Sequence, residues 1–388
     1  MYQTIIIGCG FAGAAAAREL AEKDGQRVLI IDERGHIGGN CYDTEDEYGI
    51  LVHRYGPHIF HTNIKRVYDY LSRFTKWLPY QHEVVGNIYG EELPVPFNLN
   101  ALEIVFKEQA EYMKKLLIDA YGEGARVPIL NLRESKNLEL RKIAEYVYEN
   151  IFLKYTMKQW GQKPEDIDPS VSGRVPVLLS YDNRYFQDEY QGMPKNGYRV
   201  LFENMLDHPG IDIRLNCPAK DVLSFYPGSD QAVLFEGKAY DGTIIYTGAL
   251  DELFGCQYGR LPYRSLRFKM EHYEQPFYQS HAVVNYTVTE EYTRITEYKY
   301  LSDQLDKPDT TIMKEYPIPY QGLKEEIPYY AINNPHNQEM YEKYKKTAEQ
   351  IPRFHILGRL AEYKYYNIDA IVDRAITLTE ELRKKERL

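Results

Sequence analysis

Three glycines near the N-terminus have the spacing of a dinucleotide-binding turn. Gly8, Gly10 and Gly13 form G-x-G-x-x-G directly after the apolar run 4–7, and Asp32 follows at the end of the next apolar run. These glycines permit a tight turn, a close approach of the backbone to a pyrophosphate, and close packing of helix on strand. The acid, about 20 residues further on, accepts hydrogen bonds from a ribose. A helix that begins at this turn offers N–H donors to the phosphates.

A second glycine pair lies in the segment RGHIGGN, which contains Gly38, Gly39 and Asn40. This segment resembles the extended fingerprint of FAD-binding proteins, in which two glycines beside the pyrophosphate let the longer cofactor run along the backbone. No second G-x-G-x-x-G follows in the sequence. A separate nicotinamide-binding domain is therefore not indicated, and a bound flavin would have no built-in hydride donor of the usual kind.

The hydrophobic pattern around these glycines predicts a βαβ unit. Residues 4–7 and 27–32 are apolar and β-branched, as in buried strands, and residues 14–20 are predicted as the helix between them. Beyond this unit we expect short strands over 83–97 with a turn at Gly90, helices over 99–160, a mobile loop over 161–174, antiparallel strands over 259–330, a strand over 353–358, and a helix over 369–382.

The composition excludes several classes of protein. The 388 residues carry a formal net charge of −10, so neither nucleic acid nor an anionic membrane is an expected partner. The sequence has no apolar run of membrane-spanning length and opens without a basic, apolar leader, which predicts a cytoplasmic protein. The four cysteines are far apart and form no C-x-x-C pair, so we expect neither a disulfide framework nor a metal site.

Longer motifs resemble those of the bacterial UDP-galactopyranose mutases. They are GGNCYD, YGPHIFHT, KYTMKQWG, RVPVLLSYDNRYFQDEYQGMPKNGY, TRITEYKY, PYY and LGRLAEYKYYNID. The motifs run from Ile5 to about Arg374 in the family's order, so the resemblance covers nearly the whole chain.

The resemblance implies an isomerase that interconverts UDP-galactopyranose and UDP-galactofuranose without net redox change. The family's cofactor is FAD in its reduced form, whose N5 attacks the anomeric carbon and displaces UDP. The sugar ring then opens and recloses through a different hydroxyl before UDP returns. The resemblance also implies an external reductant (NADH, NADPH or a reductase), a homodimer, and a product that supplies galactofuranose to cell-surface polysaccharide.

The fold implied by the resemblance is α/β, with a Rossmann-like FAD-binding domain, an inserted helical domain and an antiparallel β-sheet domain. The expected ranges are 1–75, 196–258 and 351–388 for the FAD-binding domain; 99–175 for the helical domain, including the mobile loop 161–174; and 76–98, 176–195 and 259–350 for the sheet domain that binds substrate.

Two arginines, Arg174 and Arg294, match the family's diphosphate-binding arginines. An acidic protein needs fixed cations to bind a nucleoside diphosphate, and arginine presents a fork that suits phosphate oxygens. Cations that stabilise the charge on departing UDP act as electrostatic catalysts. Closure of the loop would deliver Arg174 and expel water. The expected substrate contacts are Phe152, Tyr155, Thr156, Trp160, Arg174, Tyr185, Arg264, Asn285, Arg294, Tyr330 and Tyr365.

The histidine expected beside the flavin ring is His61, which completes the expected catalytic set with the two arginines. The helix expected near residue 369 would point its positive N-terminal end at the flavin and favour the negative charge of the reduced form. Expected cofactor contacts are Gly8, Gly10, Phe11, Ala12, Gly13, Asp32, Glu33, Gly39, Asn40, His58, Ile59, His61, Gly358, Arg359, Asn367, Ile368 and Asp369.

Three other functions share parts of this pattern. An FAD oxidoreductase of the amine-oxidase type would have the same glycine turns but would consume reductant or oxygen. A catalytically idle flavin- or nucleotide-binding protein would bind the cofactor without turnover. Arg174 together with Arg294, Tyr330 and Tyr365 argues against both. A mutase for a related sugar, such as UDP-N-acetylgalactosamine, would differ only in small contacts around the sugar.

Overall fold

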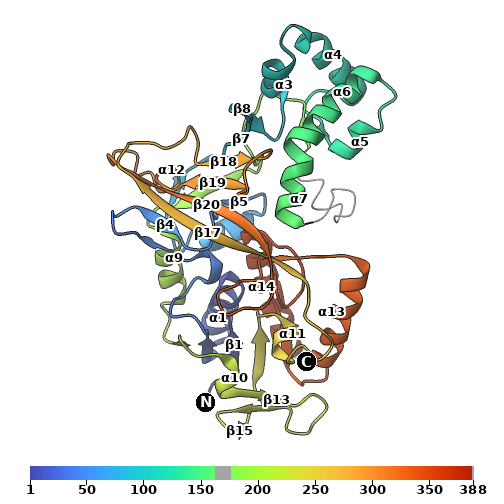
Figure 1. Ribbon diagram of the computed structural model, residues 1–388. Helices are drawn as coiled ribbons and strands as arrows, with labels where there is room; N and C mark the ends of the chain where they lie inside the picture. Colours follow the sequence, from blue (N-terminus) through green and yellow to red (C-terminus); the bar gives the residue numbers. More distant parts are fainter. Residues whose placement is uncertain (162–175, 387–388) are drawn as a thin grey trace. The chain divides into compact units, whose positions relative to one another are not determined.

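The computed structural model describes residues 1–161 and 176–386, and the chain divides into two units (Figure 1). Unit 1 combines Met1–Pro79, Asp188–Tyr263 and Tyr330–Leu388. Unit 2 combines Tyr80–Gln187 and Arg264–Tyr329. Each unit is therefore built from segments that lie far apart in the sequence.

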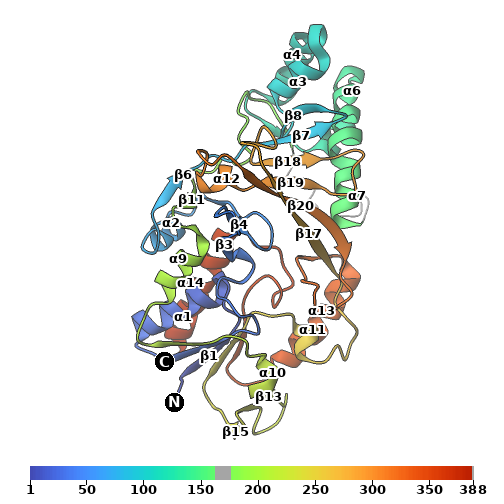
Figure 2. The same ribbon diagram turned by 60° about the vertical axis from the view of Figure 1, so that its left-hand side comes forward.

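A parallel sheet forms the centre of unit 1, in the strand order β12-β2-β1-β16-β22. All positions of β1 and β2 are buried, as expected for parallel strands covered on both faces. Helix α1 (Phe11–Asp24) packs against α14 (Ile368–Glu386) beside this sheet (Figure 2). The strands are β12 (Ile211–Arg214), β2 (Val28–Ile31), β1 (Thr4–Ile7), β16 (Thr243–Tyr246) and β22 (Phe354–Ile356).

These elements confirm the predicted βαβ unit and the C-terminal strand and helix. Helix α1 begins directly after Gly10 and ends at Gly25, which takes the left-handed conformation and donates its N–H to Leu20 O. The other elements of unit 1 are η1 (Gly39–Cys41), β3 (Asp43–Glu45), β4 (Leu51–His53), β5 (Phe60–Thr62), α2 (Lys65–Leu71), β6 (Trp77–Pro79), β11 (Tyr190–Pro194), α9 (Gly197–Leu206), α10 (Ala219–Val222), β13 (Leu223–Phe225), β14 (Val233–Phe235), β15 (Lys238–Ala239), α11 (Leu250–Leu253), β21 (Tyr330–Ala331) and α13 (Pro335–Ala348).

A largely antiparallel sheet runs through unit 2, with neighbouring strands in the order β17-β20-β19-β18-β7-β8. The predicted hairpin with its turn at Gly90 is present, and β18 pairs with β7 in parallel while the other pairs are antiparallel. The strands are β7 (Val84–Ile88), β8 (Glu91–Val95), β17 (Tyr263–Tyr273), β18 (Val283–Tyr286), β19 (Arg294–Glu297) and β20 (Thr310–Pro319).

The helices of unit 2 share one hydrophobic core with this sheet. Leu117 and Ile143 from the helices are fully buried in the same cluster as Leu93 and Val283 from the strands. The division of this region into a helical and a sheet domain stays a prediction. The remaining elements are α3 (Leu99–Phe106), η2 (Lys107–Gln109), α4 (Ala110–Tyr121), β9 (Arg126–Val127), α5 (Ile129–Arg133), α6 (Leu138–Val147), the π-helical turn η3 (Tyr148–Leu153), α7 (Lys154–Trp160), β10 (Val177–Leu178) and α12 (Lys299–Ser302).

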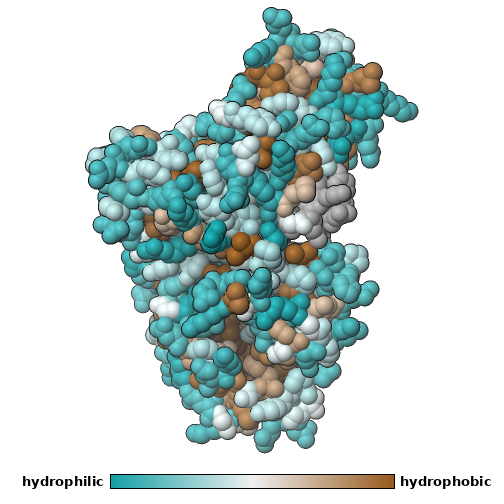
Figure 3. Space-filling model, viewed as in Figure 1, coloured by the Kyte–Doolittle hydropathy of each residue, from teal (hydrophilic) through white to brown (hydrophobic). Residues whose placement is uncertain are grey.

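Within unit 2, α6, η3 and α7 follow one another as a nearly continuous rod (Figure 2). The view in Figure 3 shows a mainly hydrophilic surface on which apolar residues form small groups. Over residues 1–161 and 176–386, no helix is both long enough and apolar enough to cross a membrane. The same described ranges contain no group of His, Cys, Asp and Glu suited to a metal ion.

Candidate functional site

The two glycine turns of unit 1 touch each other just beyond the carboxyl end of β1, the central strand of the parallel sheet. A methyl group at Gly39 would lie 2.9 Å from Gly10 Cα, and Gly39 has a φ of +56°. A methyl group at Gly13 would lie 2.0 Å from Gly8 O. Side chains at these positions would therefore fill the space in which two stretches of backbone approach one another, as they do around a pyrophosphate.

The N-terminus of α1 faces this turn with its backbone donors available. The first turn of α1, all of it described, contains no acidic residue, and Gly10 provides no side-chain cap. The free N–H groups and the positive end of the helix dipole suit an anion such as a pyrophosphate. The residues of unit 1 therefore fit a dinucleotide cofactor.

Asp32 closes the turn from the end of β2. Its carboxylate accepts hydrogen bonds from Cys9 N at 2.7 Å and from Arg34 N at 2.9 Å. Two carboxylate oxygens offer about four acceptor sites, so these bonds leave capacity for ribose hydroxyls. Its neighbour Glu33 is exposed. The assignment of Glu33 as a cofactor contact stays a prediction.

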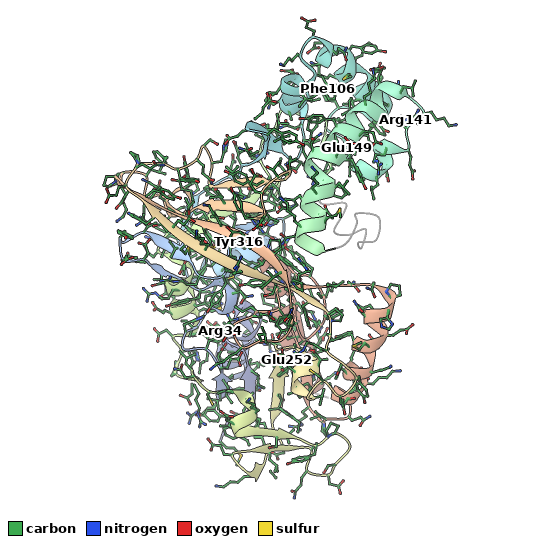
Figure 4. All side chains as sticks on the ribbon, viewed as in Figure 1. Arg34, Phe106, Arg141, Glu149, Glu252 and Tyr316 are labelled. Carbon is green, nitrogen blue, oxygen red and sulfur yellow. The ribbon has the colours of Figure 1, made fainter. Side chains whose placement is uncertain are left out.

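A stack of side chains that the sequence did not predict follows Asp32. The Arg34 guanidinium, labelled in Figure 4, lies 4.5 Å from the centre of the Tyr55 ring. The Tyr55 hydroxyl lies 2.6 Å from His36 Nε2, and the His36 ring stacks on Tyr42 at 3.9 Å. This arrangement gives the loop after β2 a fixed aromatic and cationic surface.

His61 is held by a carboxylate within unit 1. Its Nδ1 lies 2.6 Å from Asp188 Oδ2, and Asn63 donates to the other oxygen of the same carboxylate. The next residue, Thr62, donates its hydroxyl to Asp369 Oδ2 at 2.9 Å, which ties β5 to the first turn of α14. The residue next to the expected catalytic His61 is therefore hydrogen-bonded to the start of the helix that was expected to face the flavin.

The neighbouring histidines have a structural arrangement. His58 Nδ1 lies 2.8 Å from Gly56 O, and its backbone N–H donates to His53 Nδ1 at 3.0 Å. Burial lowers the pKa of His53 to about 3 and keeps the ring neutral. The contacts of His58 and Ile59 with a cofactor stay predictions.

Arg359, Tyr365 and Tyr330 form a ladder in unit 1. The Arg359 guanidinium lies 4.6 Å from the centre of the Tyr365 ring, and Tyr365 stacks on Tyr330 with centroids 6.1 Å apart. Arg359 also donates to Tyr366 O at 2.6 Å. The structure thus brings one expected cofactor residue and two expected substrate residues together. Asn367 and Ile368 lie at the start of α14, and Asn40 lies in η1.

In unit 2, Arg294 is paired with a buried carboxylate. Its Nη2 lies 2.9 Å from Glu315 Oε1, across the antiparallel pair β19–β20. Glu315 is 1% exposed, and Asn285 lies opposite Arg294 on β18. The ion pair fixes the direction of the guanidinium, and Glu315 is a residue that the sequence did not single out. Only the folded register places it beside Arg294.

Helix α7 and the turn before it carry the residues expected near the nucleotide. Thr156 and Phe152 are buried, and Phe152 belongs to the hydrophobic core of unit 2. Tyr155 is half-buried, and Tyr185 packs against that core at an edge-on angle to Phe186. Trp160 is the last residue of α7. Arg174, like the rest of the expected loop after Gly161, lies outside the described residues.

Arg264 lies at the end of α7. Its Nε and Nη2 donate to Gln159 O and Lys158 O, each at 3.1 Å, and a methyl group at Gly161 would lie 3.1 Å from its Nη1. A cation at the C-terminus of a helix stabilises the last carbonyls and the negative end of the dipole. Burial lowers the pKa of Arg264. The structure gives this residue a capping role, and its contact with substrate stays a prediction.

Two buried amide side chains of unit 2 have acceptor atoms that need a donor. Gln159 Oε1 and Asn285 Oδ1 have no hydrogen-bond partner among the described residues, although the side chains belong to residues only 5% and 7% exposed. A buried acceptor without a donor costs roughly 1–3 kcal/mol, so such atoms are usually satisfied by water or a ligand. Asn285 was expected to bind substrate. Gln159 was missed, although it lies in the motif KYTMKQWG.

The parallel sheet, the touching glycine turns and the open α1 N-terminus define a Rossmann-type dinucleotide-binding protein. The profile of NAD(P)-binding Rossmann-like domains matches residues 6–74, and the UDP-galactopyranose mutase profile matches residues 150–365. The UDP-galactopyranose mutase of Mycoplasma pneumoniae is 33% identical, covering 98% of this chain and 96% of that protein. The dTDP-fucopyranose mutase of Escherichia coli is 34% identical and covers 97% of each chain. This chain belongs to the UDP-galactopyranose mutase family, and it is an isomerase.

Solved structures support the fold. A crystal structure of reduced UDP-galactopyranose mutase matches with a TM-score of 0.70 at 15% identity, covering 99% of this chain and 94% of that one. Putrescine oxidase with bound putrescine matches with a TM-score of 0.58 at 12% identity, covering 99% of both chains. The α/β fold with a Rossmann-like domain is thus confirmed, and it is shared by mutases and amine oxidases.

Proposed function

We propose that unit 1 binds FAD and that, with the flavin reduced, the chain interconverts UDP-galactopyranose and UDP-galactofuranose. Family membership over nearly the full length supports the reaction class. The touching glycine turns and the open α1 N-terminus support a dinucleotide with a pyrophosphate. The alternative of an amine-oxidase-type oxidoreductase has support from the fold and from relatives that match only part of the chain, such as an (S)-6-hydroxynicotine oxidase over 36% of it.

Reduced flavin, when bound, supplies an electron-rich nitrogen nucleophile for the anomeric carbon. The chain's own residues then have three tasks: to hold the nucleotide, to bind the diphosphate as it leaves, and to orient the sugar. Arg294 performs the second task, because charge collects on the diphosphate as the bond to the anomeric carbon breaks. Arg174 shares this task in our proposal.

The observation that carries the proposal is the pairing of Arg294 with buried Glu315. In a chain with a net charge of −10, a guanidinium fixed in this way is a preorganised site for a dianionic sugar nucleotide, whose diphosphate gains a further negative charge as it leaves. A preorganised donor stabilises the transition state without the cost of reorienting during the reaction.

The nucleotide is held, in this proposal, by Tyr155, Thr156 and Trp160 of α7, with the orphaned acceptors of Gln159 and Asn285 available to N–H or O–H groups of the substrate. His61, with Asp188 behind it, serves the flavin or the sugar. Tyr330 and Tyr365 contribute hydroxyls to the phosphates.

The experiment is chromatography of UDP-galactofuranose incubated with dithionite-reduced, FAD-loaded protein. We expect conversion to UDP-galactopyranose, with competition by UDP. The dTDP-fucopyranose mutase of Escherichia coli is about as similar to this chain as the UDP-galactopyranose mutase of Mycoplasma pneumoniae, at 34% against 33% identity, so dTDP-fucofuranose is the second substrate to test. Furanose forms of UDP-N-acetylgalactosamine complete the panel. Conversion of dTDP-fucofuranose alone would reassign the substrate within the family.

We propose a cytoplasmic homodimer that receives electrons from NADH, NADPH or a reductase, and a product that enters cell-surface polysaccharide. Light scattering of the purified protein tests the dimer. Reduction of the bound flavin by NADH and NADPH, followed at the flavin absorbance, tests the first two electron sources.

A further inference from the structure

The turn between β18 and β19 is anchored to α7 by one half-buried lysine, Lys158. Lys158 Nζ donates to three backbone oxygens of this turn: Tyr286 O, Glu290 O at 3.0 Å, and Tyr292 O at 3.4 Å. An ammonium group has three N–H donors, so these bonds use all of them. Lys158 on the helix is thus hydrogen-bonded to backbone carbonyls on both sides of the turn.

The carbonyls belong to residues next to the expected substrate contacts. Tyr286 directly follows Asn285 at the end of β18, and Tyr292 precedes Arg294 by two residues. Asn285 and Arg294 are paired across the two strands. The position of Lys158 therefore determines where the end of this hairpin lies relative to α7.

The helix side of the contact is equally close to expected substrate residues. Lys158 lies between Thr156 and Trp160, and its carbonyl accepts a bond from Arg264. Burial lowers the pKa of Lys158 to about 8, and the nearby Glu290 carboxylate partly opposes this shift. A second bond, from Thr287 Oγ1 to Asn150 O, ties the turn to η3, so the turn is attached along the rod at two points.

We propose that Lys158 is a positioning residue that sets the spacing between the nucleotide-binding side chains of α7 and the diphosphate-binding Arg294. This inference rests on the proposed function. A UDP molecule that contacts both elements can satisfy both only at one spacing, so an unanchored hairpin would bind the diphosphate less well while α7 still binds the uridine. Lys158 need not touch the substrate for this effect.

The test compares the affinities for UDP and UMP of the full, FAD-loaded chain by calorimetry. Lys158→Met removes the three donors while keeping the length of the side chain. We expect its dissociation constant for UDP to rise about tenfold, the scale of losing one hydrogen bond to a charged group, and that for UMP to change by about twofold. Lys136→Met, at an exposed lysine of unit 2 before α6, is the matched control and should change neither constant.

A second variant carries the test if Lys158→Met does not fold. Lys158→Gln is uncharged but retains two N–H donors. Its dissociation constant for UDP, relative to that for UMP, should therefore be higher than in the wild type and lower than in Lys158→Met. Equal weakening of both ligands, or of neither, would overturn the positioning role, because a loss of general stability has no preference for the diphosphate. A wild-type chain that binds neither nucleotide would overturn the proposed function itself.

Discussion

Arg294 on β19 and Glu315 on β20 form an ion pair in which the carboxylate is almost fully buried. Removing the arginine alone would leave a buried charge without its partner, which destabilises proteins strongly. Removing both charges would avoid this penalty. The pair therefore allows the role of Arg294 in the reaction to be separated from its role in stability.

We predict that Arg294→Met lowers both turnover and stability, and that adding Glu315→Gln restores stability only. The single variant should lose up to about 3 kcal/mol of unfolding free energy, because it leaves Glu315 unpaired. Turnover should fall by about two to three orders of magnitude in both variants, the scale of losing one preorganised donor. Urea unfolding and initial rates measure the two effects. A double variant with wild-type turnover would mean that Arg294 does not bind the leaving diphosphate.

Gly39→Ala is predicted to abolish retention of the cofactor. The added methyl group would lie 2.9 Å from Gly10 Cα, where the two glycine turns meet. Gly237→Ala is the matched control, because Gly237 has a φ of +76° and an added methyl group would meet no atom within 4 Å. Both variants carry backbone strain of about 1 kcal/mol, but only the first blocks the turn. The ratio of flavin to protein absorbance after gel filtration distinguishes them, and equal flavin content would place the cofactor elsewhere.

Asp188→Ala should lower turnover without loss of flavin. Asp188 accepts a hydrogen bond from His61 Nδ1, so its removal takes away this restraint on the orientation of the ring. We expect turnover to fall about tenfold, the scale of one hydrogen bond to a charged group. The control is Asp230→Ala, an exposed acid in the loop between β13 and β14. An unchanged rate in Asp188→Ala would show that the orientation of His61 does not limit the reaction.

The free energy of unfolding is predicted to fall as the pH falls from 7 to 5. Burial lowers the pKa of His53 to about 3, so between pH 3 and 6.5 the unfolded chain binds a proton that the folded chain does not. Between pH 7 and pH 5, this one group should remove about 2 kcal/mol from the free energy of unfolding. His53→Gln keeps an acceptor for His58 N–H and should lose most of this dependence, whereas exposed His336→Gln should retain it. Urea titrations of both variants at pH 7 and pH 5 measure the change in the free energy of unfolding. An equal change in His53→Gln and His336→Gln would contradict the prediction.

Local pattern was enough to predict the elements that hold the cofactor. The spacing of the apolar runs 4–7 and 27–32, with the glycines between them, is typical of a strand, a turn, a helix and a second strand. The structure has β1, α1 and β2 at these positions. The hairpin at Gly90 and the helix after residue 367 follow from equally local signals. The order of the parallel sheet required strands from three distant segments, which no local pattern specifies.

The partners of the functional side chains were not predictable in this way. Glu315 reaches Arg294 only through the register of β19 and β20, and Lys158 reaches its three carbonyls across more than a hundred residues of chain. Asp43 provides another example, because its carboxylate accepts bonds from Tyr198 N and Arg199 N at the start of α9. Each of these contacts depends on how distant segments pack.

The measurement that tests the account most directly is the number of UDP-galactofuranose molecules converted per reducing equivalent. FAD-loaded protein is titrated with dithionite in amounts below the flavin concentration, and product is followed by chromatography. We predict that oxidised protein converts nothing, and that each reduced flavin converts many substrate molecules while remaining reduced. Equal conversion by oxidised and reduced protein, or product limited to the electrons added, would contradict a flavin-dependent isomerase.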